Sequence, residues 1–553
     1  MSSSKLQESE VRIENSLNKN EQDFIARRKR TVQQSLQKHG IICSLEEVPN
    51  IALLGSGGGE RAMVGLLGSL VQLQKTDLLD CVLYLSGVSG STWCMASLYQ
   101  ESDWSTKLEF VKNKIIQRLG GPAVCWGDSL AKLEKYYYEK DIFSLTDFWA
   151  AMVVTTYVKE IDEQPFTKYW SQESKDPFPI YTVIDKQCKQ MKEGDPWFEF
   201  TPHEAGYSLI GAFVDSSSFG SQFEKGSMIK KQPEIDMLYL QGLCGSASAD
   251  GDENLKLLWQ KIKDFINHLI PPEGMVKEDP DSRKCFQVLL DLVDMNLCVL
   301  DGKDPSALED TIRTSVNNLD GGKRQLIFQV EKLDLADKKA AKLYMKNFTM
   351  DVCNNLSVGF SFWPFDLIKS ILKCASEWIW GRTYDFLHNM TAKAVPPALL
   401  KSEMRDYEDA GLLLNSPYFS VLRKERNTEL IISLDFSDGD PFTTVKDAAK
   451  MCKEQNIPFP EVIIPHGHSE KPEDFYVFKG KNVPTVIHIP LFNVVNCGDK
   501  IEDWRKIYGT FQDPYSAEMI TELKEVAGQN ISNNKAKVVD EIRAIIEQKR
   551  SKR

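Results

Sequence analysis

The chain has 553 residues, a formal net charge of −12, seven histidines and twelve cysteines. This length can bury a large core, and the negative charge excludes a general nucleic-acid binder or a protein that bulk charge holds on anionic lipid. The cysteines form no C-x-x-C pair and follow no secretory signal, so we expect reduced thiols in a cytoplasmic protein. No apolar run approaches about 18 residues, so any membrane contact is expected to be peripheral.

Residues 1–34 are expected to form a polar N-terminal extension. Residues 21–38 have a helix-compatible pattern and carry a basic cluster at Arg27–Arg30. A solvated surface helix is the preferred interpretation of this cluster, ahead of a localisation or lipid-binding signal.

Two similar segments follow, and each is a short apolar run that ends in a glycine-rich turn. Ile51–Gly55 leads into Ser-Gly-Gly-Gly59, and Cys81–Ser86 leads into Gly87-Val-Ser-Gly-Ser91. Between them, Arg61–Gln74 carries apolar residues at helical spacing. This pattern predicts two buried parallel strands joined by a right-handed helical crossover.

The two turns carry groups that suit acyl transfer. Ser89 stands between two glycines, as the nucleophile does in a strand-to-helix elbow. Gly57, Gly58 and Gly59 have no side chains to keep their backbone N–H groups from an acyl oxygen. Arg61 follows at the start of the helix, where it can pair with a phosphate or steady a developing charge.

Each turn taken alone allows another interpretation. The glycine row could cradle a nucleotide phosphate, although it lacks the third glycine of G-x-G-x-x-G and there is no G-K-[ST]. The second turn departs from G-x-S-x-G at Ser91 and could be structural. The two turns together, each behind a strand, favour acyl transfer.

The middle of the chain is expected to be mostly helical. Residues 101–200 are interpreted as mainly helical, Leu238–Ala247 as a strand and turn, and residues 251–345 as a helical insertion. Residues 364–380 form an amphipathic helix flanked by aromatic residues. It can lie in a membrane interface or pack on the core, and the core alternative is preferred. The polar face consists of Asp366, Lys369, Lys373 and Glu377. The flanking aromatic residues are Phe360, Phe362, Trp363, Trp378 and Trp380.

Further along, residues 429–436 and 484–490 are predicted strands, residues 444–454 a helix, and the tail is helical.

A serine nucleophile needs a base, and the histidines do not supply an obvious one. None of them lies in a loop after the last predicted strands, His466 and His468 lie in a polar loop, and His488 lies within a strand. A carboxylate is therefore considered instead. Asp409 is the best placed, because it precedes Ala-Gly and the strand at 429–436.

Several motifs in combination resemble the cytosolic, group IV phospholipase A2 enzymes. They are Gly-Ser-Gly-Gly-Gly-x-Arg-Ala-Met, Leu-Ser-Gly-Val-Ser-Gly-Ser-Thr-Trp, Asp-Ala-Gly, and the stretches that begin at Trp197, Trp380 and Leu430. The resemblance runs from about residue 35 to 510 and is closest to the gamma branch, which lacks the calcium-binding C2 domain. It implies an α/β, patatin-like fold, with a central mixed, largely parallel sheet flanked by helices and a helical cap insertion.

The resemblance also implies a mechanism without a cofactor or a metal. Ser89 would attack the ester, Asp409 would take its proton, and the N–H groups of Gly58 and Gly59 would form the oxyanion hole. Arg61 would steady the phosphate or the charged intermediate. The expected activity is a calcium-independent phospholipase A2 with lysophospholipase and transacylase side activities.

The expected organisation is one catalytic domain over residues 35–515, with cap insertions at roughly 100–200 and 250–400, and a helical basic tail over 516–553. The expected partners are phospholipid and lysophospholipid substrates and the surface of an intracellular membrane, with no nucleic acid; the sequence leaves the oligomeric state open. Two rival functions stay open, a soluble serine esterase or thioesterase and a catalytically weak lipid-binding protein. Glu60 and Glu408 motivate the second rival, because relatives are expected to have apolar residues there. The chain also ends without a prenylation box.

Overall fold

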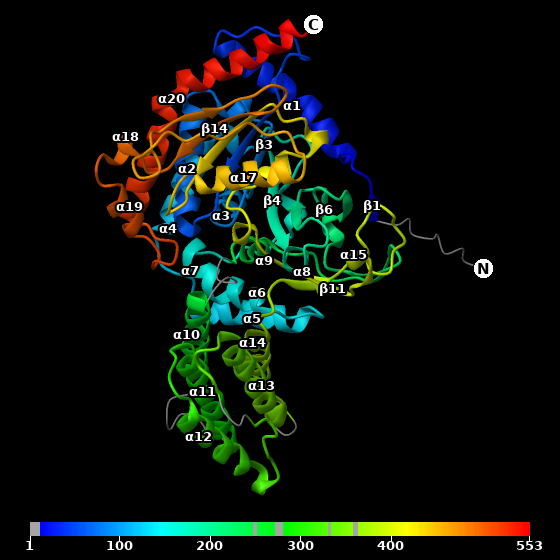
Figure 1. The fold of residues 1–553 in the computed structure, drawn as a ribbon, viewed down its shortest axis with the longest axis vertical. Coiled ribbons are helices and arrows are strands. Elements are labelled where there is room, and N and C mark those ends of the chain that lie inside the picture. The colour runs from blue at the N-terminus through cyan, green and yellow to red at the C-terminus, as the bar shows by residue number, and fades with distance from the viewer. Residues whose placement is uncertain (1–10, 247–251, 271–279, 330–332, 358–362) are drawn as a thin grey trace, which may run out of the picture. The chain divides into compact units, whose positions relative to one another are not determined.

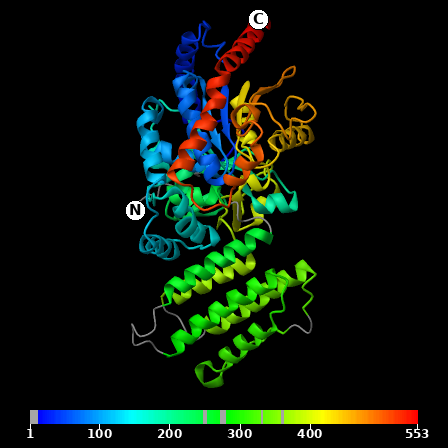
Figure 2. The same ribbon diagram turned by 90° about the vertical axis from the view of Figure 1, so that its left-hand side faces the viewer.

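The computed structural model describes residues 11–246, 252–270, 280–329, 333–357 and 363–553 (Figure 1; Figure 2 gives the view turned by 90°). These residues divide into two compact units. The first unit holds the described residues of Met1–Lys132, Trp149–Ser246 and Thr383–Arg553, and the second holds those of Leu133–Phe148 and Ala247–Arg382. The predicted domain boundaries stay predictions.

The first unit is built on a 12-stranded mixed sheet. Its main path runs β1-β7-β6-β5-β4-β3-β2-β12-β14-β13, while β11 pairs with β4 and β10 pairs with β11. The strands are β1 Val11–Ile13, β2 Ile51–Gly55, β3 Tyr84–Gly87, β4 Phe178–Asp185, β5 Trp197–Phe200, β6 Glu204–Tyr207, β7 Ala212–Asp215, β10 Arg382–Tyr384, β11 Met404–Asp409, β12 Leu430–Asp435, β13 Tyr476–Phe478 and β14 Thr485–Pro490; β8 Gln222–Glu224 and β9 Ser227–Lys230 form a separate hairpin.

The centre of the sheet is parallel. β4, β3, β2, β12 and β14 pair in parallel, and the pairings on either side of them are antiparallel. β2, β3, β4 and β12 are buried along their whole length, as expected for strands covered on both faces. The predicted α/β class with a mixed sheet is therefore confirmed, and the sheet is partly parallel.

The helices of the first unit include the predicted crossover. α2 joins β2 to β3, and nearly all of its residues are buried because α3, α4 and α20 pack on it (Figure 1). A Cβ atom at Gly68 would lie 2.3 Å from the carbonyl oxygen of Lys524 in α20, so glycine permits this close helix contact. The helices are α1 Lys19–Lys38, α2 Gly59–Lys75, α3 Gly90–Tyr99, α4 Leu108–Leu119, α7 Thr155–Val158, α8 Lys186–Met191, α9 Met237–Cys244, α15 Pro397–Lys401, α16 Tyr418–Val421, α17 Thr443–Glu454, α18 Val494–Cys497, α19 Ile501–Ile507 and α20 Ala517–Ser551.

The second unit consists of helices. α10 packs on α11, α11 on α12 and α13, and α13 on α14. The long helices are α10 Asp252–Leu269, α11 Pro280–Leu300, α12 Ser306–Asn317, α13 Lys338–Ser357 and α14 Phe365–Glu377; α5 Trp126–Glu139 and α6 Leu145–Trp149 each have residues in both units.

α14 is the predicted amphipathic helix, and its apolar face packs inside the second unit. Leu367, Ile368, Ile371 and Leu372 are fully buried, and Lys369 is buried in an ion pair with Asp366 at 2.8 Å. This burial agrees with the core alternative. Two of the predicted flanking aromatics, Phe360 and Phe362, lie outside the described residues.

Three local predictions were wrong. Residues 101–200 are not simply helical, because they contain β4, a central strand. The predicted strand at Leu238–Ala247 is the helix α9, and Ala247 lies outside the described residues. α1 is not solvated at Arg28, whose guanidinium is buried and donates to the carbonyl oxygens of Val82 at 2.7 Å and Lys175 at 2.6 Å.

All twelve cysteines lie in the described residues and are free thiols. In the described part of the chain, no helix has the length and apolar character needed to cross a bilayer.

Candidate active site

Ser89 lies in the turn between β3 and α3. Its backbone has φ 52° and ψ −122°, a conformation that is strained for a residue with a side chain. α3 begins at the next residue, Gly90, so Ser89 sits at the positive end of a helix dipole. The turn has the form of a nucleophile elbow, with the side chain presented at the end of a central strand.

The glycine row forms the matching turn between β2 and α2. Gly58 has φ 148° and Gly59 has φ 58°, which glycine adopts readily because it lacks a Cβ atom. Within the described residues, neither the N–H group of Gly58 nor that of Gly59 has a hydrogen-bond acceptor. Two free donors at the N-terminus of a helix make an anion-binding position.

The two turns are in direct contact. A Cβ atom at Gly90 would lie 1.8 Å from the carbonyl oxygen of Gly59, so only glycine fits there. The hydroxyl of Ser91 donates to the carbonyl oxygen of Ser56 at 2.6 Å. Ser91, the departure from G-x-S-x-G, therefore ties the Ser89 turn to the glycine row.

Strand pairing on β4 brings Asp409 to this place. β3 runs parallel to β4 and ends with Gly87 opposite Tyr181, whereas β11 runs antiparallel and ends with Asp409 opposite Val183. β5 pairs with β4 over Tyr181–Ile184 and occupies the other edge. β3 and β11 therefore share one edge of β4 and run toward each other, so Asp409, the last residue of β11, and Ser89, two residues after the end of β3, lie where the two strand ends meet.

Asp409 is buried, with 1% of its surface exposed, and is only partly hydrogen-bonded. Its Oδ1 accepts from the N–H of Gly411 at 2.8 Å, and its own N–H donates to the hydroxyl of Ser246 at 3.1 Å. No group of the described residues meets the distance and angle of a hydrogen bond to Oδ2. One carboxylate oxygen is thus left for a proton donor.

Burial raises the pKa of Asp409 to about 7, and the hydroxyl of Ser89 lowers this pKa as a hydrogen-bond donor does. The contact between them is looser than a full hydrogen bond, since Oδ2 has no partner of good geometry among the described residues. Hydrogen bonds between a nucleophile and its base are often long or poorly aligned until substrate binds. The charge of Glu408 adds to the raised pKa.

Asn415 is a site residue that the sequence analysis missed. Its side-chain amide donates to the backbone carbonyl oxygen of Gly57 at 3.2 Å. Its backbone carbonyl oxygen accepts from the N–H of Gly57 at 3.1 Å. It thereby holds the glycine row from the side of Asp409. The Asn-Ser-Pro turn six residues after Asp409 was the available signal.

Arg61 is 1% exposed, and the protein itself uses its donors. Its guanidinium donates to the carbonyl oxygens of Phe436 and Tyr508, each at 2.6 Å, and to the hydroxyl of Thr510 at 3.2 Å. A Cβ atom at Gly58 would lie 2.6 Å from its Nη2. Arg61 therefore packs directly against the glycine row, and its action on a phosphate or an intermediate stays a prediction.

Glu60 lies beside the same row and is buried. Its Oε2 accepts from the N–H of Tyr515 at 2.9 Å, whereas Oε1 has no hydrogen-bond partner in the described residues. Burial raises the pKa of Glu60 to about 7. This carboxylate is therefore easier to protonate than an exposed one.

His488 in a strand and His203 in the turn between β5 and β6 have other partners. His488 in β14 lies 3.2 Å from the hydroxyl of Ser433 and 2.6 Å from the carbonyl oxygen of Pro441, and His203 stacks on Phe178. Among the described residues, no histidine contributes to the pKa of Asp409.

Comparison with known proteins places the chain in a family. The family model described as the lysophospholipase catalytic domain matches residues 51–255. The chain is 34% identical to cytosolic phospholipase A2 gamma of Mus musculus, covering 95% of this chain and 91% of that protein. It is 32% identical to cytosolic phospholipase A2 gamma of Homo sapiens, covering 97% of this chain and 96% of that protein.

A solved structure shows the same fold. The human GIVD cytosolic phospholipase A2 superposes with a TM-score of 0.67 at 21% identity, covering 98% of this chain and 66% of that chain. The chain belongs to the cytosolic phospholipase A2 family.

Proposed function

We propose that the chain is a calcium-independent phospholipase A2, which hydrolyses acyl esters of glycerophospholipids at a membrane surface through Ser89 and Asp409. The relatives carry phospholipase A2 in their names and are called cytosolic, which supports the substrate class and a cytoplasmic site of action. The observation that carries the proposal is the meeting of β3 and β11 on one edge of β4.

In the first step, the hydroxyl oxygen of Ser89 attacks the ester carbonyl carbon, and its proton passes to Asp409. The carbonyl electron pair moves to the oxygen, where the N–H groups of Gly58 and Gly59 stabilise the negative charge. The intermediate then expels the lysophospholipid alkoxide. This alkoxide takes the proton from Asp409 and leaves an acyl ester on Ser89.

In the second step, water attacks the acyl ester and Asp409 takes the proton of the water. Collapse of the second intermediate returns that proton to Ser89 and releases a fatty acid. A lysophospholipid hydroxyl in place of water gives a transacylase, and a lysophospholipid in place of phospholipid gives a lysophospholipase. One site thus supports all three activities.

The electrostatics support a carboxylate base without histidine. A pKa of about 7 makes Asp409 a far stronger base than an exposed aspartate at neutral pH. α2 and α3 both begin at the site and direct their positive ends toward the developing oxyanion.

Arg61 is proposed to hold the glycine row and to add positive charge behind it. Arg61→Lys would keep the charge and lose the pair of carbonyl contacts to Phe436 and Tyr508. If Arg61 also contacts the phosphate, this variant raises KM for phospholipid more than KM for a small phenyl ester. Equal losses on both substrates would limit Arg61 to positioning.

Mass spectrometry of the products from mixed phospholipid vesicles tests the proposal. The chain should release free fatty acid and lysophospholipid without calcium, and Ser89→Ala and Asp409→Asn should each lose about a thousandfold or more of the rate. Ser532→Ala and Asp503→Asn, both at exposed positions, are the matched controls. Full activity of Ser89→Ala would overturn the mechanism.

A second comparison separates the proposal from a soluble esterase. The phospholipase proposal predicts a steep rise in rate when an ester substrate passes its critical micelle concentration. An esterase would show saturation on monomeric ester and no further rise.

A further inference from the structure

The turn that ends α9 contacts both elements that carry the proposed pair. α9 packs against α3, which begins directly after Ser89, and against β11, which ends at Asp409. Three consecutive residues of this turn, Cys244, Gly245 and Ser246, are buried and belong to the first unit. Each of them contacts a residue that leads to Ser89 or Asp409, and together they are called the α9 clamp below.

Ser246 holds the backbone of Asp409. Its hydroxyl oxygen accepts from the N–H of Asp409 at 3.1 Å, and the hydroxyl itself donates to the carbonyl oxygen of Leu243 at 3.1 Å. The helix therefore orients the hydroxyl, and the hydroxyl fixes the last residue of β11. Ser246 is fully buried, so a side chain without this hydroxyl would leave the Asp409 N–H buried and unpaired, which is unfavourable.

Gly245 sets the spacing between the clamp and α3. A Cβ atom at Gly245 would lie 2.5 Å from Nε1 of Trp93, and this Nε1–H donates to the carbonyl oxygen of Gln241 at 2.9 Å. The carbonyl oxygen of Gly245 accepts from Nε1 of Trp149 at 3.0 Å. Two buried indole groups thus hold the turn, and one of them comes from the helix that follows Ser89.

Cys244 interacts with both sides of the site. Burial raises the pKa of its thiol well above the usual range, the charge of Asp409 raises it further, and Thr92 lowers it as a hydrogen-bond partner does. The hydroxyl of Thr92 donates to the carbonyl oxygen of Ser89. Contacts from the α9 clamp therefore reach the backbone of Ser89 through Thr92 and the backbone of Asp409 through Ser246.

We propose that the α9 clamp sets the distance between Ser89 and Asp409, and that Ser246 is a positioning residue for the base. Ser246 acts through Asp409: it holds the end of β11 so that the carboxylate stays within reach of the Ser89 hydroxyl. Ser246 has this role only if Asp409 takes the proton of Ser89, so the proposal rests on the proposed function.

The rate of fluorophosphonate labelling of Ser246→Ala tests this role. The rate should fall about tenfold, less than the roughly hundredfold cost of displacing a catalytic group by about 1 Å. With an ester substrate, kcat should fall by the same factor and KM should stay unchanged, because the contact serves the transition state. Ser246→Cys, whose sulfur accepts only weakly, should lose less in the same direction and replaces the alanine variant if that variant does not fold. An unchanged labelling rate, or a raised KM with unchanged kcat, would overturn the proposal.

Ser221 provides the matched control. Its buried hydroxyl oxygen accepts from the backbone N–H of Gln232 at 2.9 Å, which is the same kind of contact in the segment before β8. Ser221→Ala should lower the urea midpoint about as much as Ser246→Ala does and leave the labelling rate unchanged. Equal losses of rate in the two variants would show that lost stability, and not the position of Asp409, slows the labelling.

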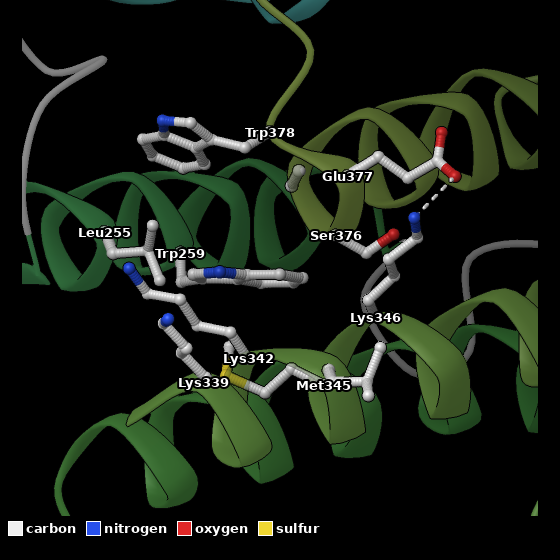
Figure 3. A pocket seen from close by; sticks show the side chains of 11 residues that line it. Leu255, Trp259, Lys339, Lys342, Met345, Lys346, Ser376, Glu377 and Trp378 are labelled. Carbon is white, nitrogen blue, oxygen red and sulfur yellow. Dashed lines mark ion pairs between the residues drawn. The ribbon is translucent and has the colours of Figure 1, made fainter. Parts of the chain in front are cut away.

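The second unit provides a control that loses packing instead of a hydrogen bond. Met345 of α13 is buried beside a pocket of about 420 Å³ between α10, α13 and α14 (Figure 3). Met345→Ala should lower the urea midpoint, because it enlarges that cavity, and should leave the labelling rate unchanged. A loss of rate as large as that of Ser246→Ala would again assign the effect to stability and overturn the positioning role.

The double variant Ser246→Ala/Asp409→Asn separates this role from the proposed function. If Ser246 acts through Asp409, the double variant should be labelled at the same rate as Asp409→Asn alone, because the base is already lost. A further loss in the double variant would mean that Ser246 acts on its own and would overturn the proposal. A wild-type rate in Asp409→Asn would refute the proposed function and the positioning role with it. A slow Asp409→Asn beside a normal Ser246→Ala would refute the positioning role alone.

Discussion

Gly90 rests on the backbone of Gly59, and a Cβ atom at Gly90 would lie 1.8 Å from the carbonyl oxygen of Gly59. One turn carries Ser89 and the other carries the two free N–H groups, so this contact sets the spacing of the proposed nucleophile and oxyanion hole. The proposed chemistry of the site therefore depends on Gly90, a position that has no side chain.

Gly90→Ala should separate the two turns. We expect a loss of about 1–3 kcal/mol in the free energy of unfolding, because the added methyl group overpacks a buried contact. The rate of fluorophosphonate labelling should fall about a hundredfold, as for a displacement of about 1 Å in a catalytic group. Urea unfolding and labelling kinetics measure the two effects. Gly439→Ala is the control, because a Cβ atom there meets nothing within 4 Å; equal behaviour of the two variants would refute the role of the contact.

The labelling rate should depend on pH through the ionisation of Asp409. The base must be deprotonated to accept the Ser89 proton, and burial raises its pKa to about 7. The rate should therefore rise with pH up to about 7 and level off above it, falling about tenfold for each pH unit below. Fluorophosphonate reactions that are quenched at set times, at pH values between 5.5 and 8.5, measure this profile. A flat profile, or one that falls as pH rises, would exclude Asp409 as the base.

Glu408→Gln should move that profile to lower pH. The charge of Glu408 raises the pKa of its neighbour, so a neutral side chain lets Asp409 ionise more easily. Glu408 also pairs with Lys189 at 3.3 Å, and the variant loses that pair. Glu403→Gln, at an exposed position before β11, should leave the midpoint unchanged. A midpoint that moves to higher pH in Glu408→Gln would contradict the electrostatic account.

Glu60→Gln should stabilise the protein above neutral pH. Burial raises the pKa of Glu60 from 4.5 to about 7, so the folded state holds this proton more tightly than the unfolded state. The protonated Glu60 therefore adds to the free energy of unfolding. This addition is fully present below about pH 4.5 and is lost as pH rises through 7, a loss of about 3 kcal/mol. Urea unfolding at pH 5 and 8.5 measures this loss of stability. Glu60→Gln should not show the loss, whereas Glu461→Gln, at an exposed position, should show the same loss as the wild-type chain. Equal pH dependence in all three chains would show that Glu60 is not buried as described.

The local parts of the site could be predicted from the sequence. β2, β3 and the two glycine turns are short segments whose apolar runs and small residues specify their own conformation. Asp409 followed from the absence of a suitable histidine and from the resemblance. The preference for a packed α14 also agrees with the structure, because its apolar stripe fills the second unit.

The long-range parts could not be predicted in this way. Asn415 holds Gly57 across a separation of 358 residues, and nothing near either residue specifies that pairing. The sequence of α9 predicts a strand, because a short apolar run suits a strand as well as a buried helix. β4 was missed inside a mainly helical stretch, although its edge is what brings Ser89 and Asp409 together. Arg28 belongs to a basic cluster that is typical of a solvated surface, and only its contacts in the folded chain bury it.

The most direct test of the account is the position of the covalent fluorophosphonate adduct in the full chain, found by peptide mass spectrometry. The proposed pair of Ser89 and Asp409 predicts one adduct, on Ser89, which is absent from Ser89→Ala and forms far more slowly in Asp409→Asn. An adduct on another residue, or an adduct on Ser89 that forms at the same rate in Asp409→Asn, would contradict the proposed pair.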